Sequence, residues 1–275
     1  MYPIIEKELI NPQVEKMVIG APYVARRCEA GQFVILRVDE RGERIPLTIA
    51  DYDREKQTVT IIYQIVGFTT RRLSEKKVGE TLADFVGPLG RPTEFHPCRR
   101  VIGIGGGVGA APLYPQLKKL HDMGTSVDLI LGARNKDLII LENLFSRFCK
   151  NIYITTDDGS LGSKGVVTDK LKELLTRGEH YDEVIAIGPV IMMKFVSLLT
   201  KQWNLKTSVS LNPIMVDGTG MCGGCRVTVG GETKFVCVDG PDFDAHQVDY
   251  DELMRRQTMY RSEESHICKI GLGGV

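Results

Sequence analysis

The pattern of hydrophobic and polar positions divides the chain near residue 98. Before that point, short runs rich in β-branched residues, such as 32–38 and 57–66, lie between turn signals, with no long helical period among them. Runs of strands at this spacing predict a small antiparallel barrel over residues 1–97. Turn-forming residues mark the exit from this barrel: Gly87, Pro88, Gly90, Pro92 and Pro97.

From residue 98 to residue 212, apolar strands and helical periods alternate. The strand-like segments are 101–104, 126–131, 152–155 and 183–187. The helix-like segments are 110–121, 137–148 with Asp137 as its cap, 166–175 and 192–200. This alternation predicts a parallel sheet flanked by helices, in which ligands bind at the carboxyl ends of the strands. Residues 213–275 follow as a cysteine-containing loop and a charged tail.

Composition narrows the functional classes. The chain has 275 residues, a hydrophobic content of 43% and a formal net charge of zero. This length allows two domains with a core each, and zero net charge argues against a broad surface for nucleic acid or an anionic membrane. No apolar run reaches the length of a membrane-spanning helix, and the N-terminus has no signal-peptide pattern.

The cysteines indicate a reducing compartment. Seven cysteines form no evident disulfide framework, so we expect the protein in the cytoplasm. Four of them are scattered and are expected to be ordinary buried thiols: Cys28, Cys98, Cys149 and Cys268.

The other three cysteines and an aspartate form a regular frame, Asp217-x4-Cys222-x2-Cys225-x11-Cys237. Plant-type ferredoxins hold a [2Fe–2S] cluster with Cys-x4-Cys-x2-Cys and a distant fourth Cys, so Asp217 stands where the first thiolate is expected. Four glycines between positions 217 and 225 allow the backbone to close around a bulky inorganic core. The frame predicts a [2Fe–2S] centre with three Cys ligands and one Asp ligand, and hence a carrier of single electrons.

Two alternatives to this ligand set stay open. The same side chains could hold a structural zinc ion, although zinc ribbons usually show two Cys-x-x-Cys knuckles. Asp239, Asp242 and Asp249 compete with Asp217 for the fourth position, although only Asp217 fits the ferredoxin spacing.

A glycine-rich turn follows the predicted strand at 101–104 and precedes a helix. Gly105, Gly106, Gly107 and Gly109 let the backbone approach a pyrophosphate, whose charge the helix N-terminus favours. The spacing is not G-x-G-x-x-G, and no acidic residue lies at the usual distance after it. An ordinary dehydrogenase nucleotide-binding domain is therefore not expected.

Three further strand ends carry candidates for the same crevice: Arg134, Asp157, and Gly188 with Met192. Arg134 and Lys136 are suited to meet the 2′-phosphate of NADP, and no obvious acidic residue excludes it. The residues themselves thus leave the choice between NAD and NADP open.

The barrel carries a second set of candidates. In the segment Arg44-Ile45-Pro46-Leu47-Thr48, a strand-fixed Arg can grip a phosphate and a Thr hydroxyl can hydrogen-bond a flavin ring. The segment with Gly67, Thr69 and Thr70 suits a dinucleotide pyrophosphate at a turn.

Taken in order, these motifs resemble the ferredoxin–NADP reductase superfamily. The chain is most similar to the subgroup with a C-terminal [2Fe–2S] loop: the electron-transfer subunits of dihydroorotate dehydrogenase and sulfide dehydrogenase, and the small subunit of NADH-dependent reduced ferredoxin:NADP oxidoreductase. The segments Cys237–Asp244 and Asp251–Gln257 resemble the last of these most, and Asp217 departs from the four-Cys pattern of the dihydroorotate type.

The resemblance implies roles for the candidate residues. FAD would be held by Arg44, Pro46, Leu47 and Thr48, with Gly67, Thr69 and Thr70 at its pyrophosphate. NAD(H), chosen on the resemblance alone, would be held by Gly105, Gly106, Gly107, Gly109, Arg134, Asp157, Gly188 and Met192. The cofactors carry the chemistry, so no catalytic side chain is expected.

The resemblance also implies a partner. A larger flavin and iron–sulfur subunit would complete a heterodimer that couples NADH and reduced ferredoxin to NADP reduction by electron bifurcation, with ferredoxin meeting that subunit rather than this chain. One alternative is an electron-transfer subunit for dihydroorotate or sulfide dehydrogenase. Another, of a different class, is a zinc-stabilised nucleotide-binding sensor without redox chemistry.

Overall fold

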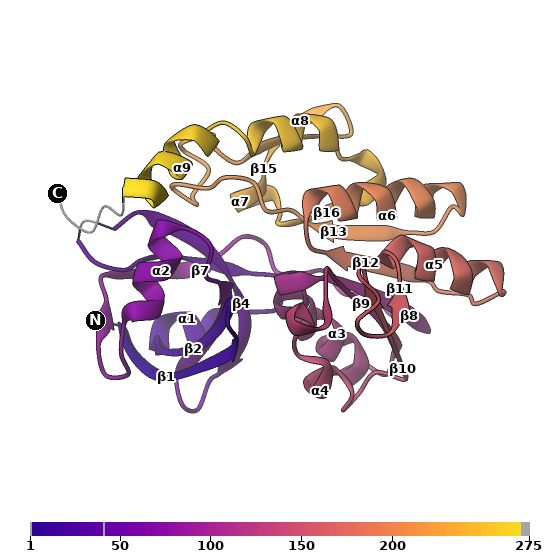
Figure 1. Cartoon of the computed structure of the whole chain (residues 1–275), viewed down its shortest axis with the longest axis horizontal. Coiled ribbons are helices and arrows are strands. Elements are labelled where there is room, and N and C mark those ends of the chain that lie inside the picture. The colour runs from indigo at the N-terminus through magenta and orange to yellow at the C-terminus, as the bar shows by residue number, and fades with distance from the viewer. Residues whose placement is uncertain (1, 41, 271–275) are drawn as a thin grey trace.

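The computed structural model describes residues 2–40 and 42–270, with side chains described up to His266. A curved sheet forms the N-terminal part, an α/β unit forms the middle, and the C-terminal segment lies along both (Figure 1). In the described part of the chain, no helix combines the length and apolar character needed to cross a bilayer. Residues 271–275 of the expected tail and the side chain of Cys268 lie outside this description.

The N-terminal sheet is a nearly closed antiparallel barrel, as the sequence predicts. Its seven strands lie in the spatial order β6 (Thr81–Leu82), β1 (Tyr2–Asn11), β2 (Val14–Gly20), β5 (Thr58–Gln64), β4 (Arg44–Asp53), β3 (Phe33–Arg37) and β7 (Asp84–Leu89). Alternate side chains point inward to a core that includes Met17, Ile19, Leu36 and Ile61, each fully buried. Two short helices accompany the strands, α1 (Pro22–Arg27) and α2 (Phe68–Glu75).

The middle unit is a parallel sheet with helices on both faces. Its strands lie in the order β11 (Ser163–Lys164), β10 (Asn151–Thr156), β9 (Ser126–Ala133), β8 (Arg100–Gly106), β12 (Glu183–Ile187), β13 (Thr207–Ser210) and β16 (Asp242–Asp244). All neighbouring pairs are parallel except β13 with β16. The predicted strands of this unit are therefore confirmed: β12 has the predicted bounds, and β8, β9 and β10 are slightly longer than their apolar runs.

The helices α3 (Ala110–Asp122), α5 (Val167–Thr176) and α6 (Val190–Gln202) pack on this sheet. Leu113 and Leu117 of α3 belong to one core cluster, whereas Leu171 of α5 and Met193 of α6 belong to another. The two clusters share the strands between them, so α3 covers one face of the sheet and the other two helices cover the opposite face.

One predicted helix is wrong. The segment 137–148 contains only a 3₁₀ turn, η2 (Lys136–Leu138), and the single-turn helix α4 (Glu142–Phe145). Asn135, rather than Asp137, caps the turn, since its side chain accepts from the Asp137 N–H. Leu141 then adopts φ +61°, which breaks the helix, while Ile140 and Phe145 are buried beneath α3.

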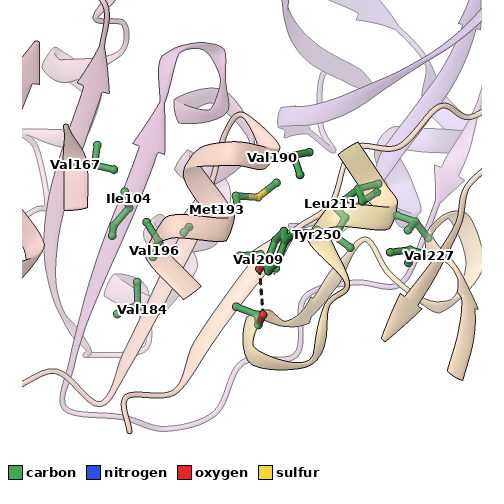
Figure 2. Close-up of a cluster of buried hydrophobic side chains, with 14 of the residues drawn as sticks. Ile104, Val167, Val184, Val190, Met193, Val196, Val209, Leu211, Val227 and Tyr250 are labelled. Atoms are coloured by element: carbon green, nitrogen blue, oxygen red, sulfur yellow. Dashed lines mark hydrogen bonds between the residues drawn. The ribbon is translucent and has the colours of Figure 1, made fainter. Parts of the chain in front are cut away.

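The C-terminal segment folds back onto the nucleotide sheet. Its elements are β14 (Arg226–Val229), β15 (Glu232–Phe235), α7 (Val236–Asp239), the edge strand β16, η3 (Ala245–Gln247), α8 (Tyr250–Arg256) and α9 (Arg261–Ile270). Figure 2 shows Tyr250 of α8 packed beside Val209 of β13 and Leu211. The expected loop and tail thus share one hydrophobic core with the α/β unit.

Candidate cofactor cleft and metal centre

A large cavity of about 1100 Å³ lies between the barrel and the parallel sheet. The barrel contributes Pro46, Leu47 and Thr48 of β4, together with residues of β5. The sheet contributes residues at the carboxyl ends of its strands, where α/β folds bind ligands. Predicted site residues lining this cleft are Pro46, Leu47, Thr48, Gly106, Gly107, Gly109, Arg134, Asp157, Gly188 and Met192.

The glycine turn at the end of β8 is shaped by close backbone packing. A Cβ on Gly109 would lie 2.3 Å from the carbonyl oxygen of Ile187, the last residue of β12. Gly107 has φ +54° with open space where a Cβ would be, and it faces the cleft. The turn thus offers bare backbone to a ligand, while Gly105 packs inward against Ala110 and Leu131.

The adjoining strand ends provide polar groups for a nucleotide. Thr155 of β10 is 2% exposed and lines the cleft, and its hydroxyl has no hydrogen-bond partner among the described residues. An orphaned buried hydroxyl costs free energy unless a ligand satisfies it, so this atom fits a bound polar cofactor. Asp157 and Arg134 line the same corner, near the start of α5.

The predicted flavin residues divide into two groups. Pro46, Leu47 and Thr48 face the cleft, but Arg44 does not line it; its Nη1 lies 3.6 Å from Asp84 Oδ2. Arg44 still contributes to the electrostatic field that lowers the pKa of Asp217. Arg44 therefore lies near β7 of the barrel and within electrostatic reach of the cluster loop.

The second group, Gly67, Thr69 and Thr70, is at the N-terminus of α2 and outside the cleft lining. The Thr70 hydroxyl accepts from the Gly67 N–H at 3.0 Å, and the Thr69 hydroxyl donates to Glu43 at 2.9 Å. The sequence predicts a turn in this segment, whereas the structure has the start of helix α2 there. A helix N-terminus is also suited to an anion, so the expected pyrophosphate contact stays a prediction.

Sequence reasoning missed one wall of the cleft. Ser210, Leu211 and Asn212 line it from the end of β13, and Phe195 lines it from α6. The pair Asn212-Pro213 is a turn signal at a strand end and was the available indication.

Two of the three frame cysteines are close together. The Sγ atoms of Cys225 and Cys237 are 3.2 Å apart and both residues are buried, without a disulfide between them. The Cys237 N–H also points to Cys225 Sγ at 3.4 Å. The hairpin of β14 and β15 produces this contact, because it returns the chain across the eleven intervening residues.

Cys222 and Asp217 lie on the exposed side of the loop. Cys222 Sγ accepts from the Gly224 N–H at 3.4 Å. Asp217 Oδ2 accepts from the N–H of Thr219 at 2.9 Å, from the Thr219 hydroxyl, and from the N–H of Met221 at 3.4 Å. Among the described residues, no three His, Cys, Asp or Glu side chains converge closely enough to form a metal site as they stand.

The electrostatic surroundings differ among the four residues of the frame. Hydrogen bonds from Thr219 lower the pKa of the Asp217 carboxyl, and backbone N–H groups lower the pKa of the Cys222 thiol. Burial raises the pKa of Cys237, and its contact with Cys225 raises it further. Metal ligation requires thiolates, so binding at the buried pair must release protons.

The donor set fits an iron–sulfur centre in kind. Three unpaired thiols and a carboxylate share a loop that includes Gly218, Gly220 and Gly223, all at positive φ. A Cβ on Gly218 would lie 2.5 Å from Ile35 Cδ1 and 2.9 Å from Leu89 Cδ1. The loop is therefore pressed against β3 and β7 of the barrel.

Two protein-family models match the chain. The iron–sulfur cluster binding domain of dihydroorotate dehydrogenase B matches residues 212–249, which contain all four frame residues. The oxidoreductase NAD-binding domain matches residues 104–198. The first match favours iron–sulfur over zinc for this loop.

Similar proteins extend these matches to the whole chain. A dihydroorotate dehydrogenase B electron transfer subunit homolog of Thermotoga maritima is 48% identical, covering 95% of this chain and 92% of its own length. The dihydroorotate dehydrogenase B electron transfer subunit of Streptococcus mutans is 34% identical, covering 89% and 96%. A chain from the structure of the NADH-dependent reduced ferredoxin-NADP oxidoreductase has a TM-score of 0.94 and 46% identity, covering 98% and 97%.

The chain belongs to the family of dihydroorotate dehydrogenase B electron transfer subunits and their homologues. It is an oxidoreductase subunit of electron transfer, with a ferredoxin reductase-type fold for FAD and NAD and a domain for an iron–sulfur cluster. More distant structures share the fold alone, such as the cytochrome b5 reductase domain of a nitrate reductase from Ulva prolifera, at 20% identity and a TM-score of 0.57.

Proposed function

We propose that this chain passes electrons between NADH, FAD and a [2Fe–2S] cluster within an electron-bifurcating NADH-dependent reduced ferredoxin:NADP oxidoreductase. One observation carries the proposal: the cluster loop rests on the barrel strands that form the cofactor cleft. Gly218 of the loop is wedged against Ile35 of β3, and Ile35 pairs in register with Pro46, which lines the cleft. A cofactor in the cleft and a cluster in the loop would share this wall.

FAD held in the cleft would supply hydride acceptance from NADH and the release of single electrons, chemistry that side chains cannot provide. Pro46, Leu47 and Thr48 would hold the flavin ring, with Arg44 near its phosphates and α2 receiving the pyrophosphate at Gly67, Thr69 and Thr70. The glycine turn at the end of β8 and the Thr155 hydroxyl would receive the nicotinamide nucleotide. Enclosure between barrel and sheet brings the two cofactors together and excludes water.

The proposed ligands of the cluster are Asp217, Cys222, Cys225 and Cys237. Cys225 and Cys237 already approach each other, so they need little movement to bind iron. Asp217 and Cys222 would turn inward from the exposed loop, which the glycines at positive φ permit.

A larger partner subunit would exchange electrons with the cluster. The exposed side of the loop is rimmed by apolar side chains: Met221 is 87% exposed and Val216 is 53% exposed. Exposed apolar residues beside a redox group suit a protein interface. The partner would be a larger flavin and iron–sulfur protein that meets ferredoxin itself, and we expect the complex in the cytoplasm.

A second candidate is electron transfer to a dihydroorotate dehydrogenase. The names of the Streptococcus mutans relative and of the matched iron–sulfur domain favour it. Asp217, which departs from the four-Cys pattern expected of that type, favours the first candidate. The partner subunit decides between them.

Native purification tests the proposal. The chain isolated without oxygen should carry noncovalent FAD, two irons and two sulfides per chain, and should co-elute with a larger flavoprotein that oxidises NADPH. Zinc in place of iron, FMN in place of FAD, or full turnover by this chain alone would each refute it. Co-elution with a subunit that oxidises dihydroorotate would support the second candidate.

A further inference from the structure

The last turn of α8 touches the cluster loop. Arg256 Nη2 donates to the carbonyl oxygen of Gly224 at 3.1 Å, and Gly224 lies between Cys222 and Cys225. The Nε of Arg256 is buried and has no hydrogen-bond partner among the described residues. A guanidinium group with a donor left over is thus fixed against the loop that carries two of the proposed ligands.

The helix that carries Arg256 is firmly anchored. Leu253 is fully buried, and the Tyr250 hydroxyl donates to the Ala245 carbonyl at 3.1 Å. Asp249 caps the helix by accepting from the Glu252 N–H at 2.9 Å. The position of the guanidinium therefore follows from the fold rather than from a flexible side chain on an open surface.

The C-terminal end of α8 also contacts the wall of the cofactor cleft. Gln257, the residue after Arg256, donates from Nε2 to the Asn212 carbonyl at 2.9 Å, and Asn212 lines the cleft. Two neighbouring residues at this end of α8 thus contact the cluster loop and the cleft wall.

Arg256 forms no ion pair with a carboxylate in the described part of the chain. Arg91, by contrast, lies 3.7 Å from Asp239, and Arg226, which reaches the Gly223 carbonyl at 3.4 Å, is exposed to solvent. Arg256 is thus a half-buried cation in contact with the loop that has no carboxylate at ion-pair distance among the described residues.

We propose that Arg256 sets the reduction potential of the iron–sulfur centre, an inference that rests on the proposed function. Reduction adds negative charge to the cluster, so a nearby cation shielded from water stabilises the reduced form more than the oxidised form. Hydrogen bonds donated around the ligands also stabilise the reduced form and so raise the reduction potential. Arg256 raises the potential and favours electron transfer from the cleft to the cluster.

A redox titration followed by EPR tests this role. In the holoprotein, Arg256→Gln lowers the midpoint potential of the cluster relative to the wild type, while iron and sulfide contents stay the same. Arg255→Gln is the matched control, because Arg255 is the preceding residue of α8 and is exposed. The cluster of Arg255→Gln should have the same midpoint potential as that of the wild type. The gap between wild type and Arg256→Gln should persist at high salt, since screening acts mainly on exposed charges.

A second variant keeps the test decisive if Arg256→Gln loses its cluster. Arg256→Lys retains the charge without the planar fork, and it should keep the cluster at a potential nearer to the wild type. Loss of the cluster in both variants makes Arg256 a structural residue and overturns the inference. An unchanged potential in Arg256→Gln also overturns it. A wild-type chain without any iron–sulfur cluster refutes the proposed function instead, so the two failures are distinguishable.

Discussion

At the scale of single residues, the proposed role of Asp217 as the fourth cluster ligand is the most specific. Its carboxylate accepts two backbone N–H groups and a hydroxyl within its own loop, which keeps it ionised and close to the cysteines. The three competing carboxylates each accept a hydrogen bond from a group outside residues 217–225. Asp239 Oδ2 accepts from the Phe235 N–H at 2.7 Å, Asp242 Oδ2 accepts from the Thr93 hydroxyl at 2.6 Å, and Asp249 caps α8.

Substitutions at Asp217 should therefore change the cluster. Asp217→Cys restores the common all-thiolate set and should keep a [2Fe–2S] cluster with altered EPR g-values and potential, because a carboxylate is a harder ligand. Asp217→Ala should lower the iron content, and Cys222→Ala, Cys225→Ala and Cys237→Ala should lower it further. Iron analysis and EPR measure these outcomes, with bound FAD unchanged in every variant.

The matched control for Asp217 is Asp239→Asn, since Asp239 is a carboxylate near the same cysteines. It should leave the g-values unchanged. If both Asp217 variants also leave the spectrum and potential unchanged, Asp217 is not a ligand and another residue holds the fourth position.

Asp242 predicts a pH dependence of stability. Burial raises the pKa of its carboxyl, while hydrogen bonds from Thr93, Ser210 and Gln116 lower it by less. The Thr93 hydroxyl lies 2.6 Å from Asp242 Oδ2. The folded protein thus binds a proton that the unfolded chain releases near pH 4, so this carboxyl destabilises the fold as pH rises from there through its folded pKa.

Asp242→Asn removes that proton and its pH dependence. The free energy of unfolding of Asp242→Asn should exceed that of the wild type by an amount that grows with pH. The growth is at most about 1.4 kcal/mol per pH unit and stops above the pKa of Asp242 in the folded protein. Urea unfolding between pH 4.5 and 8 measures it. Asp244→Asn, at an exposed carboxyl of the same strand, is the control. Parallel pH curves for the wild type and Asp242→Asn would contradict the assignment.

At the scale of elements, the glycine turn at the end of β8 gives a steric prediction. Gly109→Ala places a Cβ against the backbone of Ile187 and Gly188, which cannot rotate away. We expect a loss of about 3 kcal/mol in the free energy of unfolding, the upper end for overpacking, together with weaker NADH binding. Thermal or urea unfolding and NADH titration measure the two effects.

Gly107→Ala is the matched control in the same turn. It meets no atom, and only its φ of +54° opposes a side chain, so the expected cost is about 1 kcal/mol. Equal losses for the two variants would show that the contact with Ile187 does not shape the turn.

The elements also show what sequence patterns can predict. The sequence pattern predicts the helices α3, α5 and α6, because each buries one regular face in a core of the sheet. It predicts the strands β8, β9, β10 and β12 as short apolar runs, and the central ones are buried on both faces of the sheet. It fails at 137–148, where Ile139, Ile140 and Leu141 suggest a helix. In this segment the apolar side chains pack into the core under α3 although the backbone is irregular. The break in the helix at Leu141, where φ is +61°, has no signal in the sequence.

Only part of the candidate site can be predicted from the sequence. Spacing alone selects the three cysteines, since a ligand frame is local in sequence. The wall formed by Ser210, Leu211 and Phe195 is not predictable, because it depends on how β13 and α6 meet the barrel. The place of Arg256 beside Gly224 likewise depends on the path of α8 back to the loop.

At the scale of the whole molecule, hydrogen bonds connect the cluster segment to the two units that form the cleft. Arg91, in the segment between β7 and β8, donates from its backbone N–H to the Gly240 carbonyl at 2.7 Å and from Nε to the Val238 carbonyl at 3.0 Å. The edge strand β16 then pairs with β13 of the nucleotide sheet. The cluster segment is therefore hydrogen-bonded both to the chain that leaves the barrel and to the nucleotide sheet.

In the proposed function, electrons from NADH reach the iron–sulfur centre within this chain. The most direct measurement is low-temperature EPR of the anaerobic holoprotein after addition of NADH, with dithionite as the reference reductant. NADH should produce the signal of a reduced [2Fe–2S] cluster that matches the one produced by dithionite, and this signal should be lost in Cys225→Ala. Absence of a cluster signal with either reductant, or a signal with dithionite but none with NADH, would refute electron transfer from NADH to a cluster in this chain.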